Sequence, residues 1–196
     1  SLWATRMTTA MMLPIAERMD RIGFDAIELM AMVVFDVCVR FLKENPWERL
    51  RLIRRKITRT PLQGMIRSKA LTGFGVVPND LRLLWAERLV ANGMRSITAF
   101  DALADLDNVV YILKFAKELG AYTVGTLVYG HSPVHTDELY TQKTKELIER
   151  AGVDAIKLKD PCGLLTPDRI RTIVPAMKKV MGNLPLELHC HSLTGL

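Results

Sequence analysis

Strand-like and helix-like segments alternate along the whole chain, and this alternation limits the possible folds more than any other feature. A helix is expected before each strand, and five of these helices end at a glycine, a residue that commonly terminates helices. The expected strands are residues 26–30, 62–67, 96–100, 122–129 and 154–159, and a sixth that runs into the last ten residues. Such alternation predicts a parallel sheet with right-handed crossovers.

Two parallel architectures fit this pattern, the doubly wound sheet and the (β/α)8 TIM barrel. Polar side chains gather where the expected strands end, and both architectures bind ligands at that edge. These residues are Arg67, Asp101, Lys159, His189 and His191. No Gly-x-Gly-x-x-Gly follows any expected strand, which argues against a dinucleotide fold. We therefore predict an α/β fold of the barrel type.

The expected barrel is incomplete. A complete (β/α)8 barrel takes about 250 residues, whereas this chain has 196 residues and about six strand–helix units. We expect the first and eighth strands to be missing, and we expect residues 1–196 to form part of one domain. No linker or low-complexity segment interrupts the chain.

Composition narrows the class of protein. The chain is 49% hydrophobic and 24% charged, and it has no run of about 18 apolar residues that could span a membrane. Its net charge is +6, but the densest basic run, residues 49–56, keeps helical apolar spacing and lacks an aromatic platform, so nucleic-acid binding is not expected. Three scattered cysteines favour the reducing cytoplasm.

The last expected strand carries a His-x-His pair. His189 and His191 lie two residues apart, so both imidazoles point to the same side of a strand and can bind one zinc, manganese or cobalt ion. Lys159 ends the preceding expected strand, where a lysine is costly unless it is paired or chemically changed. A neutral lysine can take up carbon dioxide to become a carbamate ligand. From composition alone a salt bridge is favoured over carbamylation, and Lys157, one layer deeper, could compete.

Several motifs resemble those of the biotin-dependent carboxyltransferases. Residues 159–167, Lys-Asp-Pro-Cys-Gly-Leu-Leu-Thr-Pro, are similar to Lys-Asp-Met-Ala-Gly-Leu-Leu-x-Pro in that family. Its members include the carboxyltransferase domain of pyruvate carboxylase, the oxaloacetate decarboxylase alpha subunit and the transcarboxylase 5S subunit. Further stretches agree in the same order, at residues 2–7, 35–42, 46–51, 100–103, 132–136 and 189–191. The resemblance thus covers essentially the whole chain and identifies it as an internal fragment of a divergent member.

The resemblance implies a set of site residues. The metal ligands would be Lys159 as its carbamate, His189 and His191, and Arg67 would hold the carboxylate of a 2-keto acid. Asp36 would belong to the biotin pocket. A further aspartate ligand and a threonine that shuttles a proton fall outside this sequence.

The resemblance also implies a reaction and partners. Carboxybiotin loses carbon dioxide in the site, and the enolate of a 2-keto acid of the pyruvate or oxaloacetate type captures it, or the reverse occurs in a decarboxylase. The implied cofactors are a divalent metal and biotin, and the implied partners are biotin carrier and biotin carboxylase modules. The full-length protein would be a homo-oligomer, whereas the fragment by itself is expected to be inactive.

Departures from the family pattern leave two alternatives open. The family's Arg-Gly-x-Asn-x-x-Gly-Tyr is here residues 67–74, with Ser68 at the first glycine and Phe74 at the tyrosine that would bond Asp36. Ala104 stands at the asparagine of Leu-Asn-Asp. The acceptor therefore need not be pyruvate. One alternative is a biotin-independent metallolyase of the HMG-CoA lyase type, and the other is a catalytically degenerate barrel that serves as a subunit.

Overall fold

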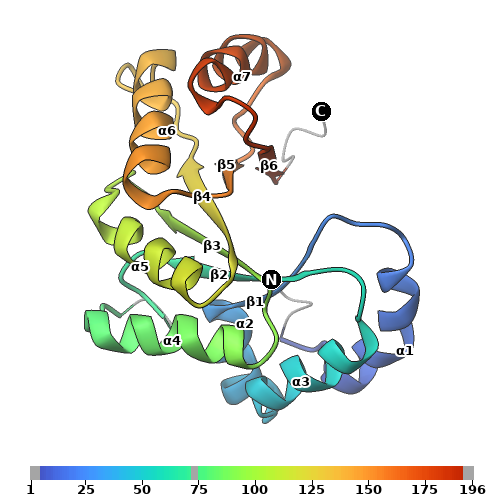
Figure 1. Ribbon diagram of the computed structural model, residues 1–196. Coiled ribbons are helices and arrows are strands. Elements are labelled where there is room, and N and C mark those ends of the chain that lie inside the picture. The colour runs from blue at the N-terminus through green and yellow to red at the C-terminus, as the bar shows by residue number, and fades with distance from the viewer. Residues whose placement is uncertain (1–4, 72–74, 192–196) are drawn as a thin grey trace.

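One parallel sheet of six strands runs through the computed structural model, which describes residues 5–71 and 75–191 (Figure 1). Its strands are β1 (Ile27–Ala31), β2 (Leu62–Arg67), β3 (Ser96–Asp101), β4 (Tyr122–Val128), β5 (Ala155–Asp160) and β6 (Leu186–Cys190). They lie side by side in the order in which they occur in the sequence. A doubly wound sheet reverses its strand order partway along, so this order identifies an incomplete (β/α)8 barrel, as predicted.

Helices connect the strands, and α4, α5 and α6 follow one another along one side of the sheet (Figure 1). The helices are α1 (Thr9–Asp20), α2 (Met32–Val37), α3 (Pro46–Lys56), α4 (Asn79–Ala91), α5 (Asp107–Glu118), α6 (Asp137–Ala151) and α7 (Pro167–Met181). Side chains of Thr8, Asn45, Thr136 and Thr166 accept hydrogen bonds from the first turns of α1, α3, α6 and α7. These caps account for where those helices begin.

The side of the sheet that faces the helices forms the hydrophobic core. Fully buried side chains from α4 and α5 meet the outward side chains of β2 and β3, for example Leu89, Ile112 and Ile97. Gly64 of β2 allows this close packing, because a Cβ atom there would lie only 3.2 Å from Leu89 Cδ1. Beside it, Trp85 packs edge-on against Phe35, with ring centroids 4.8 Å apart.

The opposite side of the sheet, which is the barrel interior, is polar. Gln63 of β2 donates to Ser96 Oγ of β3 at 2.9 Å, and the Thr98 and Thr126 hydroxyls lie 2.7 Å apart. Alternate residues of a strand point to opposite faces. The inward positions therefore carry the polar side chains on which any site at this face must be built.

The structure differs from the sequence prediction in two places. Residues 32–42 form α2 and the π-helical turn η1 (Cys38–Leu42), which the prediction missed because the apolar run there has no helix-start signal. The last strand ends at Cys190, so His191 follows the strand rather than lying in it. None of the helices in the two described ranges is long and apolar enough to cross a membrane.

Candidate functional site

Three predicted ligand residues converge at the carboxyl ends of β5 and β6. Lys159 and His189 are register partners in the parallel pair, and this pairing brings Lys159 Nζ within 3.2 Å of His189 Nε2. His191 continues past the strand, where its backbone N–H donates to Asp160 O at 3.2 Å. Its Nε2 atom lies 3.0 Å from His189 Nε2. The structure thus places the side-chain ends of Lys159, His189 and His191 around one point.

Burial favours the neutral forms of two of these groups. Burial, reinforced by the neighbouring Lys159 and His191, lowers the pKa of His189 to about 4. Burial also lowers the pKa of Lys159, whose side chain lies with Nζ 5.2 Å from the centre of the Phe100 ring. A neutral imidazole keeps a lone pair for a metal ion. His189 is therefore in its ligating form at neutral pH.

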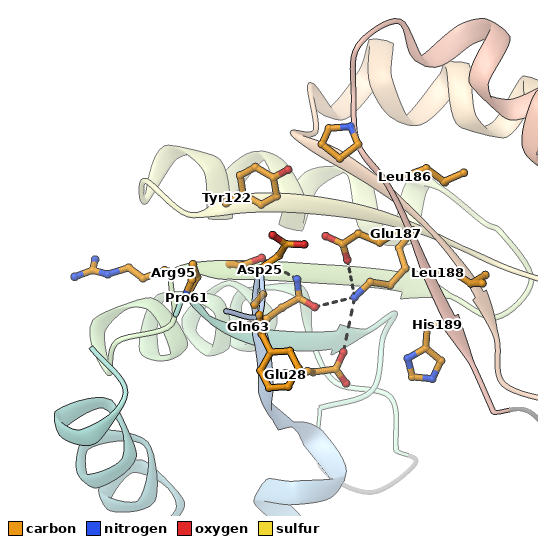
Figure 2. Close-up of a pocket in the computed structure, with 15 residues that line it drawn as sticks. Asp25, Glu28, Pro61, Gln63, Arg95, Tyr122, Leu186, Glu187, Leu188 and His189 are labelled. Carbon is orange, nitrogen blue, oxygen red and sulfur yellow. Dashed lines mark hydrogen bonds and ion pairs between the residues drawn. The ribbon is translucent and has the colours of Figure 1, made fainter. Parts of the chain in front are cut away.

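Lys157 and Lys159 share a face of β5, but their surroundings differ. Lys157 Nζ donates to Gln63 Oε1 at 2.7 Å, and it lies 3.1 Å from Glu187 Oε2 and 3.8 Å from Glu28 Oε2. Figure 2 shows the side chains of Gln63, Glu28 and Glu187 pointing toward one another on the inner face of the sheet. Lys157 Nζ thus lies within ion-pair distance of two carboxylates, whereas Lys159 makes no ion pair within residues 5–71 and 75–191.

The polar interior around Lys157 borders a cavity of about 840 Å³ (Figure 2). Its wall includes Glu28, Gln63 and Glu187 near the amino ends of the strands, and it extends along β6 as far as His189. The cavity therefore reaches one of the three converging ligand candidates, His189, whereas most of its wall lies toward the amino ends of the strands.

The donor set fits a divalent metal ion. Two histidine nitrogens at about 2.1 Å from one ion lie about 3.0 Å apart at an octahedral angle and about 3.4 Å apart at a tetrahedral one. The observed separation of 3.0 Å between the two Nε2 atoms matches this range. Among the described residues no group of three or more histidine, cysteine, aspartate or glutamate side chains could hold a metal ion. Lys159, whose Nζ lies 3.2 Å from His189 Nε2, is the predicted third ligand nearest to this pair.

Asp160 is a buried residue that the sequence analysis did not single out. Its Oδ2 accepts from the backbone N–H of Leu165 at 2.7 Å, and Cys190 Sγ lies 3.9 Å from the same oxygen. Within the described chain its Oδ1 has no hydrogen-bond partner. The carboxylate fixes the loop between β5 and α7, and its place directly after Lys159 was the signal that could have identified it.

Arg67 lies at the carboxyl end of β2, beside a second hollow. This hollow has a volume of about 250 Å³, and its wall includes Arg67, Ser68, Lys69 and Asp101. Two cations and the ends of two neighbouring strands thus border one small space. The two cations on that wall suit a small anion such as a carboxylate.

The two residues assigned to the biotin pocket are only partly described. Asp36 lies in α2, where its Oδ2 is 3.2 Å from Arg40 Nη1, one turn further along the helix. The Asp36 side chain is 24% exposed, so it is accessible from solvent at this point. Phe74 lies outside the described residues.

Proteins that are named as carboxylases or carboxyltransferases align with at least 98% of the chain. No family model matches the sequence. It is 42% identical over 196 residues to a subunit of pyruvate carboxylase from Methanocaldococcus jannaschii, covering all of this chain and 34% of that protein. It is 36% identical to the 2-oxoglutarate carboxylase large subunit of Hydrogenobacter thermophilus and 35% identical to the methylmalonyl-CoA carboxyltransferase 5S subunit of Propionibacterium freudenreichii. Those alignments cover 98% and 100% of this chain, and 29% and 39% of the relatives.

Solved structures agree with the sequence comparison. The carboxyltransferase domain of Rhizobium etli pyruvate carboxylase with pyruvate and biocytin superposes with a TM-score of 0.91 at 28% identity, covering 98% of this chain and 33% of that one. The chain therefore spans about a third of the length of the proteins it matches. These relatives are named as enzymes, and this chain is similar to pyruvate carboxylase and to the 5S subunit over at least 98% of its length.

Proposed function

We propose that the protein containing this chain transfers a carboxyl group between carboxybiotin and a 2-keto acid. The observation that carries the proposal is the convergence of Lys159, His189 and His191 at the carboxyl ends of β5 and β6. The names of the relatives support the substrate class, because they refer to pyruvate and 2-oxoglutarate, which are both 2-keto acids. Residues 1–196 would be part of its carboxyltransferase barrel domain.

A divalent zinc, manganese or cobalt ion would be held by His189, His191 and the carbamate of Lys159. When bound, the ion supplies positive charge that stabilises the enolate oxygen of the keto acid. Lys159 is the better candidate for carbamylation because Lys157 Nζ lies within ion-pair distance of Glu187 and Glu28, whereas Lys159 makes no ion pair among the described residues. We therefore propose a carbamate at Lys159 in place of the salt bridge that composition alone favours.

Arg67 would bind the keto-acid carboxylate. Its planar guanidinium can donate two parallel hydrogen bonds to a carboxylate, which fixes the orientation of the acid as well as its position. The hollow of about 250 Å³ at Arg67 is large enough for a small acid. The cation of Lys69 on the same wall would add attraction for a negatively charged substrate.

Asp36 and Phe74 would contribute to the biotin pocket, and the partners would be biotin carrier and biotin carboxylase modules. The Asp36 side chain pairs with Arg40 and is 24% exposed, so part of its carboxylate remains accessible for such a contact. We further propose a cytoplasmic homo-oligomer for the full-length protein. These assignments rest on the chain's resemblance to the biotin-dependent carboxyltransferases.

The test is oxaloacetate decarboxylation by the full-length protein, with and without free biotin. Biotin-stimulated loss of oxaloacetate should be abolished by His191→Ala and retained by His131→Ala, a control histidine in the exposed turn after β4. Absence of turnover with both pyruvate-type and 2-oxoglutarate-type acceptors would contradict the proposal.

A second candidate is a biotin-independent metallolyase of the HMG-CoA lyase type. Phe74 favours it, because this residue lacks the hydroxyl that would bond Asp36 in the family's biotin pocket. Metal-dependent cleavage of an acyl-CoA substrate, with no response to biotin, would support this candidate over carboxyl transfer.

A further inference from the structure

Two strained residues lie in the loops after β2 and β3. Within the described ranges, three non-glycine residues have positive φ, and two of them are Ser68 at 39° and Ala104 at 56°. This conformation suits glycine and, to a lesser extent, asparagine, but it is unfavourable for serine and alanine. The family pattern has glycine and asparagine at these two positions. This chain has serine and alanine at these positions, in a conformation that glycine and asparagine adopt more easily.

Asp101, at the end of β3, contacts both strained residues. Its Oδ2 accepts from Ser68 Oγ at 2.5 Å, and its backbone carbonyl accepts from the Ala104 N–H at 3.2 Å. The first distance is at the short end of the range for a hydroxyl that donates to a carboxylate. A strained backbone persists where surrounding contacts hold it in place. Asp101 supplies those contacts here.

The Asp101 carboxylate has no capacity left for a substrate. Besides the Ser68 hydroxyl, Oδ2 accepts from Asn108 Nδ2 at 3.0 Å, and Oδ1 accepts from the N–H groups of Leu103 at 2.9 Å and Asp105 at 3.2 Å. Two carboxylate oxygens offer about four lone-pair sites. All of them are occupied, and the residue is buried. Asp101 therefore acts on the loops and not on a bound molecule.

Ser68 transmits this constraint to Arg67. The N–H of Ser68 donates to Phe100 O at 2.7 Å, and the N–H of Ala70 donates to Arg67 O at 2.9 Å, which closes a tight turn directly after Arg67. The positive φ of Ser68 sets the path of this turn. Because Arg67 is both the last residue of β2 and the first residue of this turn, a change in the turn's path would displace the end of the strand that carries the Arg67 side chain. Arg67 and Asp101 line the same hollow.

We propose that Asp101 is a positioning residue that holds the strained Ser68 turn and so sets the direction from which Arg67 reaches the carboxylate of the keto acid. This inference rests on the proposed function and assigns a role beyond it. In a chain with glycine at position 68 the turn would form unaided. Here the hydrogen bond from the Ser68 hydroxyl to Asp101 stabilises a conformation that glycine would adopt without such help.

The test uses the full-length protein and compares Asp101→Asn in two backgrounds. One background is the natural chain, and the other carries Ser68→Gly and Ala104→Gly, which remove the strain. The asparagine NH₂ group cannot accept a hydrogen bond. In one orientation it faces the Asn108 NH₂ group, and in the other it faces two backbone N–H groups, so at least one native hydrogen bond is lost either way.

In the natural background, Asp101→Asn should raise KM for the keto acid at least tenfold and change kcat less than threefold. In the glycine background the same substitution should raise KM less than threefold. Ser68→Ala, which keeps the strain and removes only the hydroxyl, should resemble Asp101→Asn. A purely structural role would lower the folded fraction equally in both backgrounds, and equal KM effects in the two would overturn the proposal.

A second readout does not depend on activity. The rate at which phenylglyoxal modifies Arg67, followed by peptide mass mapping, should change at least threefold in Asp101→Asn and return toward the natural value in the glycine background. If the natural protein turns over no keto acid, the proposed function fails while this rate still decides the role of Asp101. An unchanged rate in Asp101→Asn would overturn the positioning role.

Discussion

Replacement of Arg49 by methionine should destabilise the protein, because the buried Arg49 of α3 pairs with Glu44 and donates a hydrogen bond to Thr9 of α1. The Arg49 side chain is only 3% exposed, and its Nη2 lies 2.7 Å from Glu44 Oε2. Its Nε donates to Thr9 Oγ1 at 2.9 Å, and Nη2 also donates to Met7 O at 3.0 Å. Methionine keeps much of the apolar volume but removes all three interactions.

The magnitude follows from what remains around Glu44. Removal of one partner of a buried ion pair costs about 3–5 kcal/mol. Glu44 is 23% exposed and keeps hydrogen bonds from the Thr9 N–H, at 3.0 Å and 3.1 Å, and from the Thr9 hydroxyl at 2.6 Å. Its carboxylate would thus remain partly satisfied and partly hydrated, so we expect a loss of about 2–3 kcal/mol.

Urea unfolding of the full-length protein measures this loss, with Arg51→Met as the matched control. Arg51 lies in the same helix and pairs with Glu48 at 2.7 Å, but both side chains are more than 40% exposed. Exposed pairs contribute about 0.2–1 kcal/mol, so the control should change the midpoint little. Combination with Glu44→Gln should show a non-additive effect. If Arg49→Met costs no more than Arg51→Met, the interpretation of a buried structural pair is wrong.

Three smaller predictions test other contacts. Burial alone would raise the pKa of Asp20, but hydrogen bonds from three backbone N–H groups lower this pKa well below its usual range. The stabilising effect of the Asp20 carboxylate is therefore present at neutral pH and lost on acidification. Asp20→Asn should destabilise the protein at pH 7 and make its melting temperature depend less on acid pH. Gly64→Ala should cost about 1–3 kcal/mol in urea unfolding because of the Leu89 contact, whereas Gly75→Ala, with open space around it, should cost less than about 0.5 kcal/mol. Tyr140→Phe should cost about 1–3 kcal/mol by the same measurement, because the buried Tyr140 hydroxyl bonds both a backbone N–H and a strand carbonyl.

The alternation of strands and helices was predictable because local signals determine it. Helix caps such as Thr136 and Thr166, and glycines after the helices, marked the boundaries to within a few residues. The sequential strand order then followed from the barrel choice. The α2 and η1 segment was not predictable, because a short apolar run without helix caps can form either a strand or a helix.

The candidate site was predictable in its residues but not in its contacts. The motif order indicated Lys159, His189 and His191, and strand parity placed them on one face. Parity could not distinguish Lys159 from Lys157, since only the folded sheet brings Glu28 and Glu187 to the latter. The positive φ angles of Ser68 and Ala104 were likewise not predictable, because serine and alanine rarely adopt that conformation.

Metal analysis of the purified full-length protein tests whether Lys159, His189 and His191 together hold one divalent metal ion. We expect about one equivalent of zinc, manganese or cobalt per chain in the natural protein and in His131→Ala. We expect loss of the metal in His191→Ala and in Lys159→Ala, with both variants still folded by circular dichroism. Full metal content in folded Lys159→Ala and His191→Ala would show that these residues do not hold the metal.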